Sequence, residues 1–387
     1  MRGEERVVDG ATDEVDLPHG GSVRGTSPAG IEIRGRLRCG DDTRVEGPLR
    51  CGAIEAEGGT LELNGSATVA GTVEVGRRAS LRVRGDLSSR RLISHRWVHV
   101  DGGLTCETVE VGGELEVGGE GKLQSLEVGG RVRIGGTLGA RRVEVGGKIE
   151  VGGGNWEGPV SVGGSLTVEG PLQFQSLEVG GRIVLRGAAQ GASIEIGGAL
   201  ETQGDLRLTR GLEVGGLARI GGRLETDRVE VGGLLRTTSF QGGDVEVGGT
   251  LEVDHEFQGR NLQVGGSFRA ERARVEQRAE IGDRATTRTG LRAGEIWIER
   301  NGRVEGPLVG TRVTLQRGTQ AEDVWGETIR LERDVHVRNV YGRRVEVERG
   351  ASVAGDLLYV EELRGDLGSA RFDHSPRKTG DLPPAPL

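Results

Sequence analysis

Few residues in this chain have the types and spacing that chemistry requires. His95 and His99 are four positions apart, so on a β-strand they would share a face where two imidazoles could begin a metal site. No third ligand is spaced to complete such a site. Neither Lys122 nor Lys148, each preceded by Gly, is followed by Ser or Thr, so neither belongs to a phosphate-binding loop. We therefore expect no metal and no cofactor.

Nucleophile motifs are also missing. The sequence has no G-x-S-x-G elbow, and no Ser-His-Asp set follows from its pattern. Solenoid acyltransferases use a His on a turn, yet residues 102–250 contain no His. Cys39 and Cys51 occupy slots where the repeats carry Val or Ile, which indicates small core residues. We expect no enzyme activity; an acyltransferase-like solenoid enzyme is the alternative of that class.

One acidic residue type recurs through the repeats. A Glu stands at the centre of an apolar-Glu-apolar triplet in repeat after repeat. The acidic stripe consists of Glu110, Glu127, Glu144, Glu178, Glu195, Glu213, Glu230 and Glu246. Like charges stacked about 4.8 Å apart are mildly unfavourable unless neighbouring Arg residues offset them. We interpret the stripe as a solvated face, or alternatively as a surface that binds a partner or prevents lateral association.

An internal repeat predicts the elements that carry these residues. Gly pairs ending the phrase V-x-V-G-G recur in steps of 16 to 18 residues. The first members of these pairs, the turn glycines, are Gly112, Gly129, Gly146, Gly163, Gly180, Gly197, Gly215, Gly232, Gly248 and Gly265. Before each pair, apolar residues flank a polar one, which is the alternation of a strand with one buried face. Gly suits the turn because it adopts positive φ without steric cost.

A second series of Gly pairs trails the first by six or seven residues, so each repeat divides into three short segments. This pattern predicts an all-β fold, a single long parallel β-solenoid of triangular cross-section with about 17 residues per turn. We expect it to be right-handed, because parallel crossovers nearly always are. The low aromatic content, 3%, suits a narrow interior of Val, Ile, Leu and small side chains.

The repeat also sets the expected domain limits. We predict a β-solenoid rod over residues 29–372, a disordered acidic tail at 1–28 and a disordered tail at 373–387. The net charge of −8 disfavours nucleic acid as a partner. No apolar stretch approaches the roughly 18 residues of a membrane span, and the N-terminus lacks a signal peptide's apolar region. We therefore expect no membrane segment and a cytoplasmic location.

The two ends of a solenoid expose unpaired backbone groups that recruit another chain unless something blocks them. No amphipathic helix adjoins the repeats at either end, so we expect end-to-end self-association. The candidate contact residues are Ile31, Ile33 and Leu37 near one end, and Leu357, Leu358 and Leu363 near the other.

The V-x-V-G-G and V-x-G-x-V turns, the tails and the lack of caps resemble the bactofilins, the polymer-forming cytoskeletal proteins. The resemblance covers about residues 30–370, in a rod longer than is common in that family. It implies a right-handed triangular β-helix that assembles into nucleotide-independent filaments. Our hypothesis is such a structural protein, with itself as partner. The alternative is a non-polymerising binding module that presents its flat faces to another protein or complex.

Overall fold

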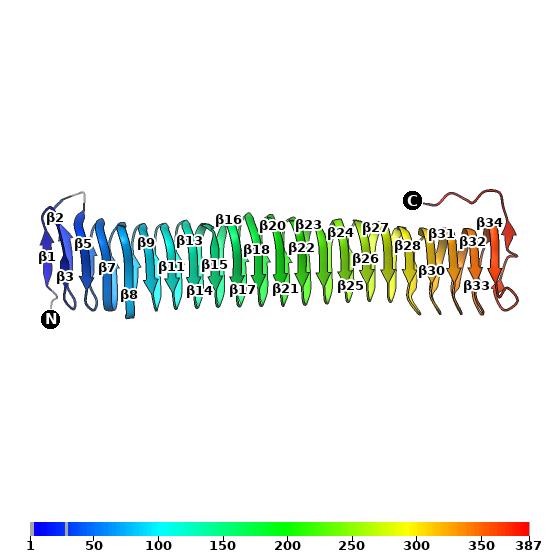
Figure 1. Ribbon diagram of the computed structural model, residues 1–387, viewed down its shortest axis with the longest axis horizontal. Helices are drawn as coiled ribbons and strands as arrows, with labels where there is room; N and C mark the ends of the chain where they lie inside the picture. Colours follow the sequence, from blue (N-terminus) through cyan, green and yellow to red (C-terminus); the bar gives the residue numbers. More distant parts are fainter. Residues whose placement is uncertain (1–3, 28–29, 387) are drawn as a thin grey trace. The chain divides into compact units, whose positions relative to one another are not determined.

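The computed structural model describes residues 4–27 and 30–386. The fold is all-β, a parallel β-solenoid of about 22 turns with about 17 residues per turn (Figure 1). The predicted fold class and repeat length are therefore confirmed. Among the described residues, no helix is long and apolar enough to cross a membrane. Two compact units, Met1–Ile196 and Gly197–Leu387, are described separately below.

In the first unit, strands pair in parallel with strands one turn before and one turn after. Longer strands, such as β7 and β16, pass through a corner and contribute to more than one side. The strands are β1 (Glu5–Val8), β2 (Ala11–Thr12), β3 (Val15–Leu17), β4 (Ser22–Gly25), β5 (Ile31–Cys39), β6 (Arg44–Glu46), β7 (Leu49–Leu63), β8 (Ala67–Val83), β9 (Leu87–Ser94), β10 (Trp97–Val100), β11 (Leu104–Val111), β12 (Glu114–Val117), β13 (Gly121–Val128), β14 (Arg131–Ala140), β15 (Arg142–Val145), β16 (Lys148–Val162), β17 (Ser165–Val168), β18 (Leu172–Val179), β19 (Arg182–Leu185) and β20 (Ala189–Ile196).

The second unit continues the same parallel pairing, with register shifts at several corners. Its strands are β21 (Ala199–Thr202), β22 (Leu206–Val214), β23 (Leu217–Val231), β24 (Leu234–Val247), β25 (Thr250–Val253), β26 (Glu256–Val264), β27 (Ser267–Ile281), β28 (Arg284–Ile298), β29 (Arg303–Glu305), β30 (Leu308–Leu315), β31 (Gln320–Leu331), β32 (His336–Val347), β33 (Ser352–Val353), β34 (Leu357–Gly365), β35 (Arg371–Phe372) and β36 (Arg377–Lys378).

Strand alternation separates the interior from the surface on each side of a turn. Leu126 and Val128 are buried while Glu127 between them is exposed. Each residue pairs with its counterpart one turn away, so Glu127 lies between Glu110 and Glu144. A residue type that recurs once per turn therefore forms a continuous column along the solenoid.

The turn glycines are required for close approach rather than for a left-handed backbone. The positive φ expected at the turn glycines is wrong, because Gly129 and Gly146 are not among the glycines with positive φ. Gly47, which is not one of the turn glycines, does have a positive φ, of 106°. A β-carbon on Gly129 would lie 2.4 Å from the carbonyl oxygen of Gly112, and one on Gly146 would lie 2.4 Å from that of Gly129. Successive corners stack too closely to admit a side chain.

Several aromatic side chains lie in the core, although the interior is narrow. Trp156 is 1% exposed and lies inside the first unit. In the second unit, Phe257 stacks on Phe240 with ring centroids 4.9 Å apart and meets Phe268 edge-on at 5.8 Å. These rings fill turns whose other inward residues are aliphatic or small.

Strands extend beyond the predicted limits of the rod. Strands β1 to β4 lie within residues 1–28, so the described part of that stretch is not a disordered tail. The predicted boundary at residues 28 and 29 lies outside the described residues. At the other end, Arg377–Lys378 of the predicted tail 373–387 forms a strand that pairs with β34. Residues 1–28 contain a single Gly pair, Gly20–Gly21, without the V-x-V phrase directly before it, and residues 373–387 contain none.

Candidate functional site

The acidic stripe of the first unit is a ladder of carboxylates on successive turns. Glu127 pairs in register with Glu110 on one side and Glu144 on the other. Ser161 occupies the next position and interrupts the ladder, which then resumes. The ladder in this unit consists of Glu110, Glu127, Glu144, Glu178 and Glu195.

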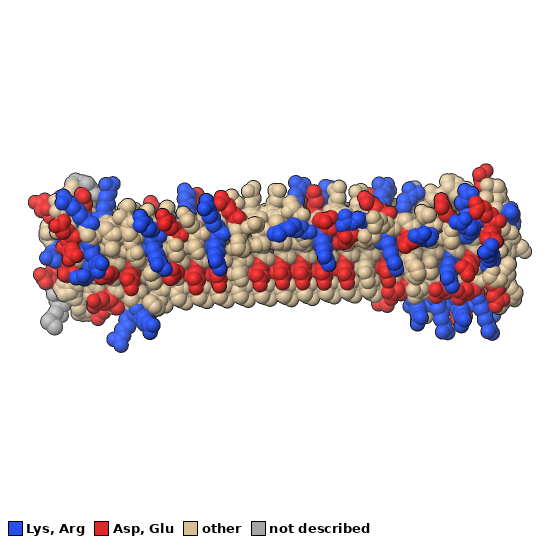
Figure 2. Space-filling model, viewed as in Figure 1, with Lys and Arg blue, Asp and Glu red and all other residues tan. Residues whose placement is uncertain are grey.

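The second unit carries the same ladder on the same side of its turns. Glu230 pairs in register with Glu213 and Glu246, and the column continues through Gln263 to Glu280. Figure 2 shows rows of acidic side chains beside a surface band without charge. Each row presents carboxylates at the strand spacing of about 4.8 Å.

Most of the ladder carboxylates have no cationic partner. Arg91 lies 2.6 Å from Glu110 and Arg228 lies 3.8 Å from Glu230, and Glu144 also has an Arg partner. Within the described residues, no ion pair within 4 Å is found for Glu127, Glu178, Glu195, Glu213 and Glu246. The ladder is therefore an anionic surface suited to cationic groups in a partner.

Sequence reasoning missed some members of this column. Glu55 and Glu74 pair in register, and Ile93 separates them from the predicted ladder. Their spacing is 19 residues rather than 17, because β7 and β8 contain register shifts at their corners. The triplets I-E-A and V-E-V, with Glu between apolar residues, are the signal that could have identified them.

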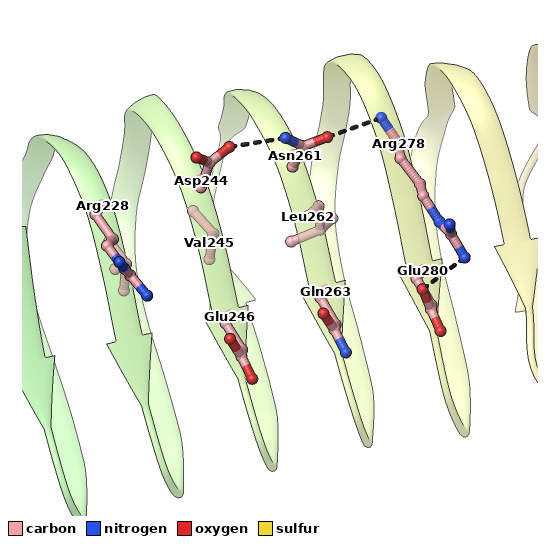
Figure 3. A pocket seen from close by; sticks show the side chains of 10 residues that line it. Arg228, Asp244, Val245, Glu246, Asn261, Leu262, Gln263, Arg278 and Glu280 are labelled. Atoms are coloured by element: carbon pink, nitrogen blue, oxygen red, sulfur yellow. Dashed lines mark hydrogen bonds and ion pairs between the residues drawn. The ribbon is translucent and has the colours of Figure 1, made fainter.

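A shallow groove of about 430 Å³ lies on this side of the second unit. Figure 3 shows Asp244, Asn261 and Arg278 on successive turns along it. The amide nitrogen of Asn261 donates to a carboxylate oxygen of Asp244 at 2.8 Å, and the backbone N–H of Arg278 donates to Asn261 Oδ1 at 3.3 Å. The Arg278 guanidinium also lies 2.9 Å from Glu280. Polar side chains thus link neighbouring turns along the groove.

The carboxylate of Asp244 in the groove accepts hydrogen bonds from neighbouring side chains. Hydrogen bonds from Arg260, and then from Asn261, lower the pKa of Asp244. A carboxylate stabilised in this way is a poor general base. The groove's geometry therefore supports cross-turn structure and surface recognition rather than proton transfer.

The two histidines considered for a metal site have separate environments. His99 Nδ1 lies 2.8 Å from Glu116 and its Nε2 lies 2.6 Å from Asp101, so both ring nitrogens have carboxylate partners. His95 is exposed in the turn before β10. Over residues 4–27 and 30–386, no group of three or more His, Cys, Asp or Glu is arranged to hold a metal ion.

The cysteines are free thiols in the core, as predicted from their slots in the repeat. Cys39, Cys51 and Cys106 are all buried. Burial raises the pKa of Cys39 and of Cys51 to about 12, so both remain protonated near neutral pH. A buried, protonated thiol is a poor nucleophile, which fits a packing role.

The residues predicted to contact another rod near the N-terminus do not lie at the end. Ile31, Ile33 and Leu37 belong to β5 in the second turn, with exposures of 2%, 1% and 0%. Strands β2 and β3 of the first turn pair with β5 and cover it. An additional turn precedes these residues, so they lie one turn inward from the described N-terminal strand edge.

The predicted contact residues near the C-terminus have different positions. Leu357 is buried, and Leu358 faces outward between Tyr341 and Arg377 on adjacent strands. Leu363 is half-buried in the outermost part of β34, where no further described strand pairs with it. Of the three, only Leu363 lies at a free edge.

Comparison with known proteins finds no matching family model, no similar curated protein and no similar solved structure. The class that the fold defines is a parallel β-solenoid repeat protein. The candidate functional surfaces are the acidic ladder of each unit and the strand edges of the first and last turns.

Proposed function

We propose that the chain is a structural protein whose solenoid associates end to end into filaments without nucleotide. The observation that supports this most directly is the open edge of the first turn. Among the described residues, β1 pairs with β4 alone, and β2 and β3 pair with β5 alone. An unpaired edge is a template for another strand. The resemblance of the repeats to those of bactofilins supports the same proposal.

The direction of the backbone groups identifies which residues form this edge. The carbonyl oxygens of Val8 and Leu17 accept hydrogen bonds from N–H groups of the second turn, at 3.2 and 2.8 Å. Peptide groups alternate in direction along a strand. Val7 and Asp16, one position earlier, therefore direct their N–H and C=O groups away from the solenoid. Val7 is also 50% exposed, unlike the other Val residues of the first turns.

The last turn offers a second, partly covered edge. Strand β36 pairs with β34 at Leu358 and Tyr359. Among the described residues, no strand lies outside Glu361–Gly365 of β34. Two such edges allow either a head-to-tail contact that continues the parallel sheet or contacts between like ends.

Proline substitution at the open edge tests the proposal. Val7→Pro with Asp16→Pro removes two outward N–H donors and retains the hydrogen bonds to the second turn. We expect filaments of the unaltered chain in negative-stain microscopy without nucleotide, and discrete particles of the double Pro variant. Val7→Thr with Asp16→Ala retains both N–H groups and is expected to polymerise normally.

Circular dichroism must show the same β-sheet signal for all three chains, so that loss of filaments reports on the edge. Discrete particles of the unaltered chain at every concentration in sedimentation velocity would count against end-to-end assembly. Filaments that persist in the double Pro variant would assign the contact to another surface.

A second candidate function is a non-polymerising module that binds a protein along one face. The unpaired carboxylates at Glu213 and Glu246 favour a basic partner surface. Titration calorimetry with polylysine tests this, with binding expected to weaken as salt rises. Binding that does not decrease when Glu213, Glu230 and Glu246 are replaced by Gln would remove the ladder as the site.

A further inference from the structure

An apolar strip lies on the outside of the last turns. Trp325, Tyr341 and Leu358 face outward at the same position of successive turns, where they pair in register. The rings of Trp325 and Tyr341 have centroids 4.9 Å apart. In earlier turns the same column carries Arg274 and Arg292, and it becomes apolar at Val309, one turn before Trp325. We name Trp325, Tyr341 and Leu358 the aromatic strip.

The chain's final described segment, residues 374–386, returns across this strip. It leaves the last turn at β36, where the N–H of Thr379 donates to the carbonyl of Tyr359 at 2.8 Å. The indole nitrogen of Trp325 then donates to the carbonyl oxygen of Pro383 at 3.2 Å. Figure 1 shows the segment running back over the preceding turns to the C-terminus. It therefore crosses the strands instead of pairing along them.

The composition of this segment fits the chemistry of the strip. Residues 381–386 read Asp-Leu-Pro-Pro-Ala-Pro and form no regular secondary structure. Proline fixes φ, so an extended Pro-containing segment loses little conformational entropy when it binds. Its carbonyl oxygens remain free to accept hydrogen bonds. Neighbouring aromatic rings on a surface are the feature that binds such segments in other proteins, and here the indole N–H adds a donor for their carbonyl groups.

The segment is attached by few and exposed contacts. Asp356 forms an ion pair with Arg377 at 3.1 Å, and its carboxylate lies 3.2 Å from His374 Nδ1; the side chains of Arg377 and His374 are both exposed. Exposed ion pairs contribute little to stability. The segment can therefore detach from the strip while the turns beneath stay folded.

We propose that the aromatic strip is a peptide-binding site for an extended proline-containing segment. Residues 381–386 are its resident ligand in the same chain, and the same segment of a second copy takes the site when the resident one detaches. This exchange links two copies through the sides of their last turns. It does not rest on end-to-end assembly, which uses strand edges.

Weakening the resident segment in the full chain tests the proposal. Replacing Pro383, Pro384 and Pro386 with Ala leaves the solenoid untouched and reduces occupancy of the strip. A fluorescent peptide of residues 374–386 stands for the segment of a second copy. In anisotropy titrations we expect it to bind this triple variant about five-fold more tightly than the unaltered chain, because less intramolecular competition remains.

Trp325→Phe, added to the triple variant, retains a ring and removes the indole donor, and should weaken peptide binding about five-fold. The matched control is Trp297→Phe, at a half-buried Trp outside the strip, which should have no effect. Trypsin should also cleave after Lys378 faster in the triple variant than in the unaltered chain. Equal peptide affinity of these two full chains, or binding insensitive to Trp325→Phe, would overturn the proposal.

Discussion

The α-carbon of Gly129 faces the carbonyl oxygen of Gly112 in the preceding turn, and a β-carbon there would lie 2.4 Å from that oxygen. Because the atom in the way is backbone, the turn itself must move to accommodate a side chain. Gly129→Ala is therefore expected to lower the free energy of unfolding by about 1–3 kcal/mol. Denaturant unfolding followed by circular dichroism measures the change.

Gly139→Ala is the matched control within the same unit. A β-carbon on Gly139 would have the carbonyl of Gly121 as its nearest neighbour, at 3.9 Å, which is an ordinary contact. This variant should stay within about 0.5 kcal/mol of the unaltered chain, or gain slightly from reduced freedom of the unfolded chain. If Gly129→Ala were equally well tolerated, close stacking of the corners would not explain the Gly pairs.

Trp156 is buried in the first unit with no hydrogen-bond partner for its indole nitrogen among the described residues. Trp156→Ala removes most of a core side chain and should cost about 3–5 kcal/mol. Trp156→Phe also loses volume, but it removes an unsatisfied buried N–H, which offsets part of the loss. We expect the Phe variant to cost less than about 1.5 kcal/mol in denaturant unfolding. A cost of the Phe variant well above this value would mean that the N–H has a hydrogen-bond partner in solution.

The acidic ladder is expected to oppose side-by-side association. Replacing Glu213, Glu230 and Glu246 with Gln removes three stacked charges without changing side-chain size. We expect stronger light scattering from bundles, and a gain in stability of up to about 1 kcal/mol from relief of repulsion between adjacent turns. High salt should reproduce the association in the unaltered chain, because it screens exposed charges.

A variant with the same net charge separates the ladder from total charge. Glu225, Glu252 and Glu256 each lie within 4 Å of an Arg on the same unit. Replacing these three with Gln should not promote bundling, because it breaks ion pairs and leaves the charges of the ladder in place. Equal scattering from the two triple variants would indicate that net charge alone controls association.

The repeating part of the fold could be predicted because each turn carries its own signal. Leu126 and Val128 alternate with a charge and precede a Gly pair, and the same arrangement returns one turn later. The first turn has one Gly pair, Gly20–Gly21, but Pro18 and His19 stand directly before it in place of the V-x-V alternation. Val8, Val15 and Leu17 are too sparse to indicate strands until the neighbouring turn is known to support them.

The contacts of the aromatic strip could not be read from spacing. Trp325 and Tyr341 are one turn apart, a spacing that the repeat predicts. Pro383, which accepts the hydrogen bond from the indole of Trp325, is 58 residues from it. That contact depends on how the chain leaves the last turn, and no periodic pattern encodes it. For the same reason, the sequence predicted Leu358 as an end contact, whereas in the structure this residue faces outward on the side of the last turns.

The buried thiols predict a loss of stability at alkaline pH. Burial raises the pKa of Cys39 and of Cys51 from 9.0 to about 12, and the charge of Cys39 contributes to the shift at Cys51. Between these two pH values the unfolded chain releases thiol protons that the folded chain retains. Stability from this source is therefore present below pH 9 and falls as the pH rises toward 12. The slope is about 1.4 kcal/mol per pH unit for each thiol that ionises only on unfolding.

Cys39→Ala with Cys51→Val removes both titrating groups and keeps small apolar side chains in their columns. Cys39 lies in register next to Ala56, and Cys51 lies next to Val69, so both replacements match a neighbouring turn. Across the alkaline range, the unfolding free energy of this variant should fall less steeply than that of the unaltered chain. Parallel curves would show that the thiols do not titrate differently in the folded and unfolded states, and the alkaline loss would then come from other groups.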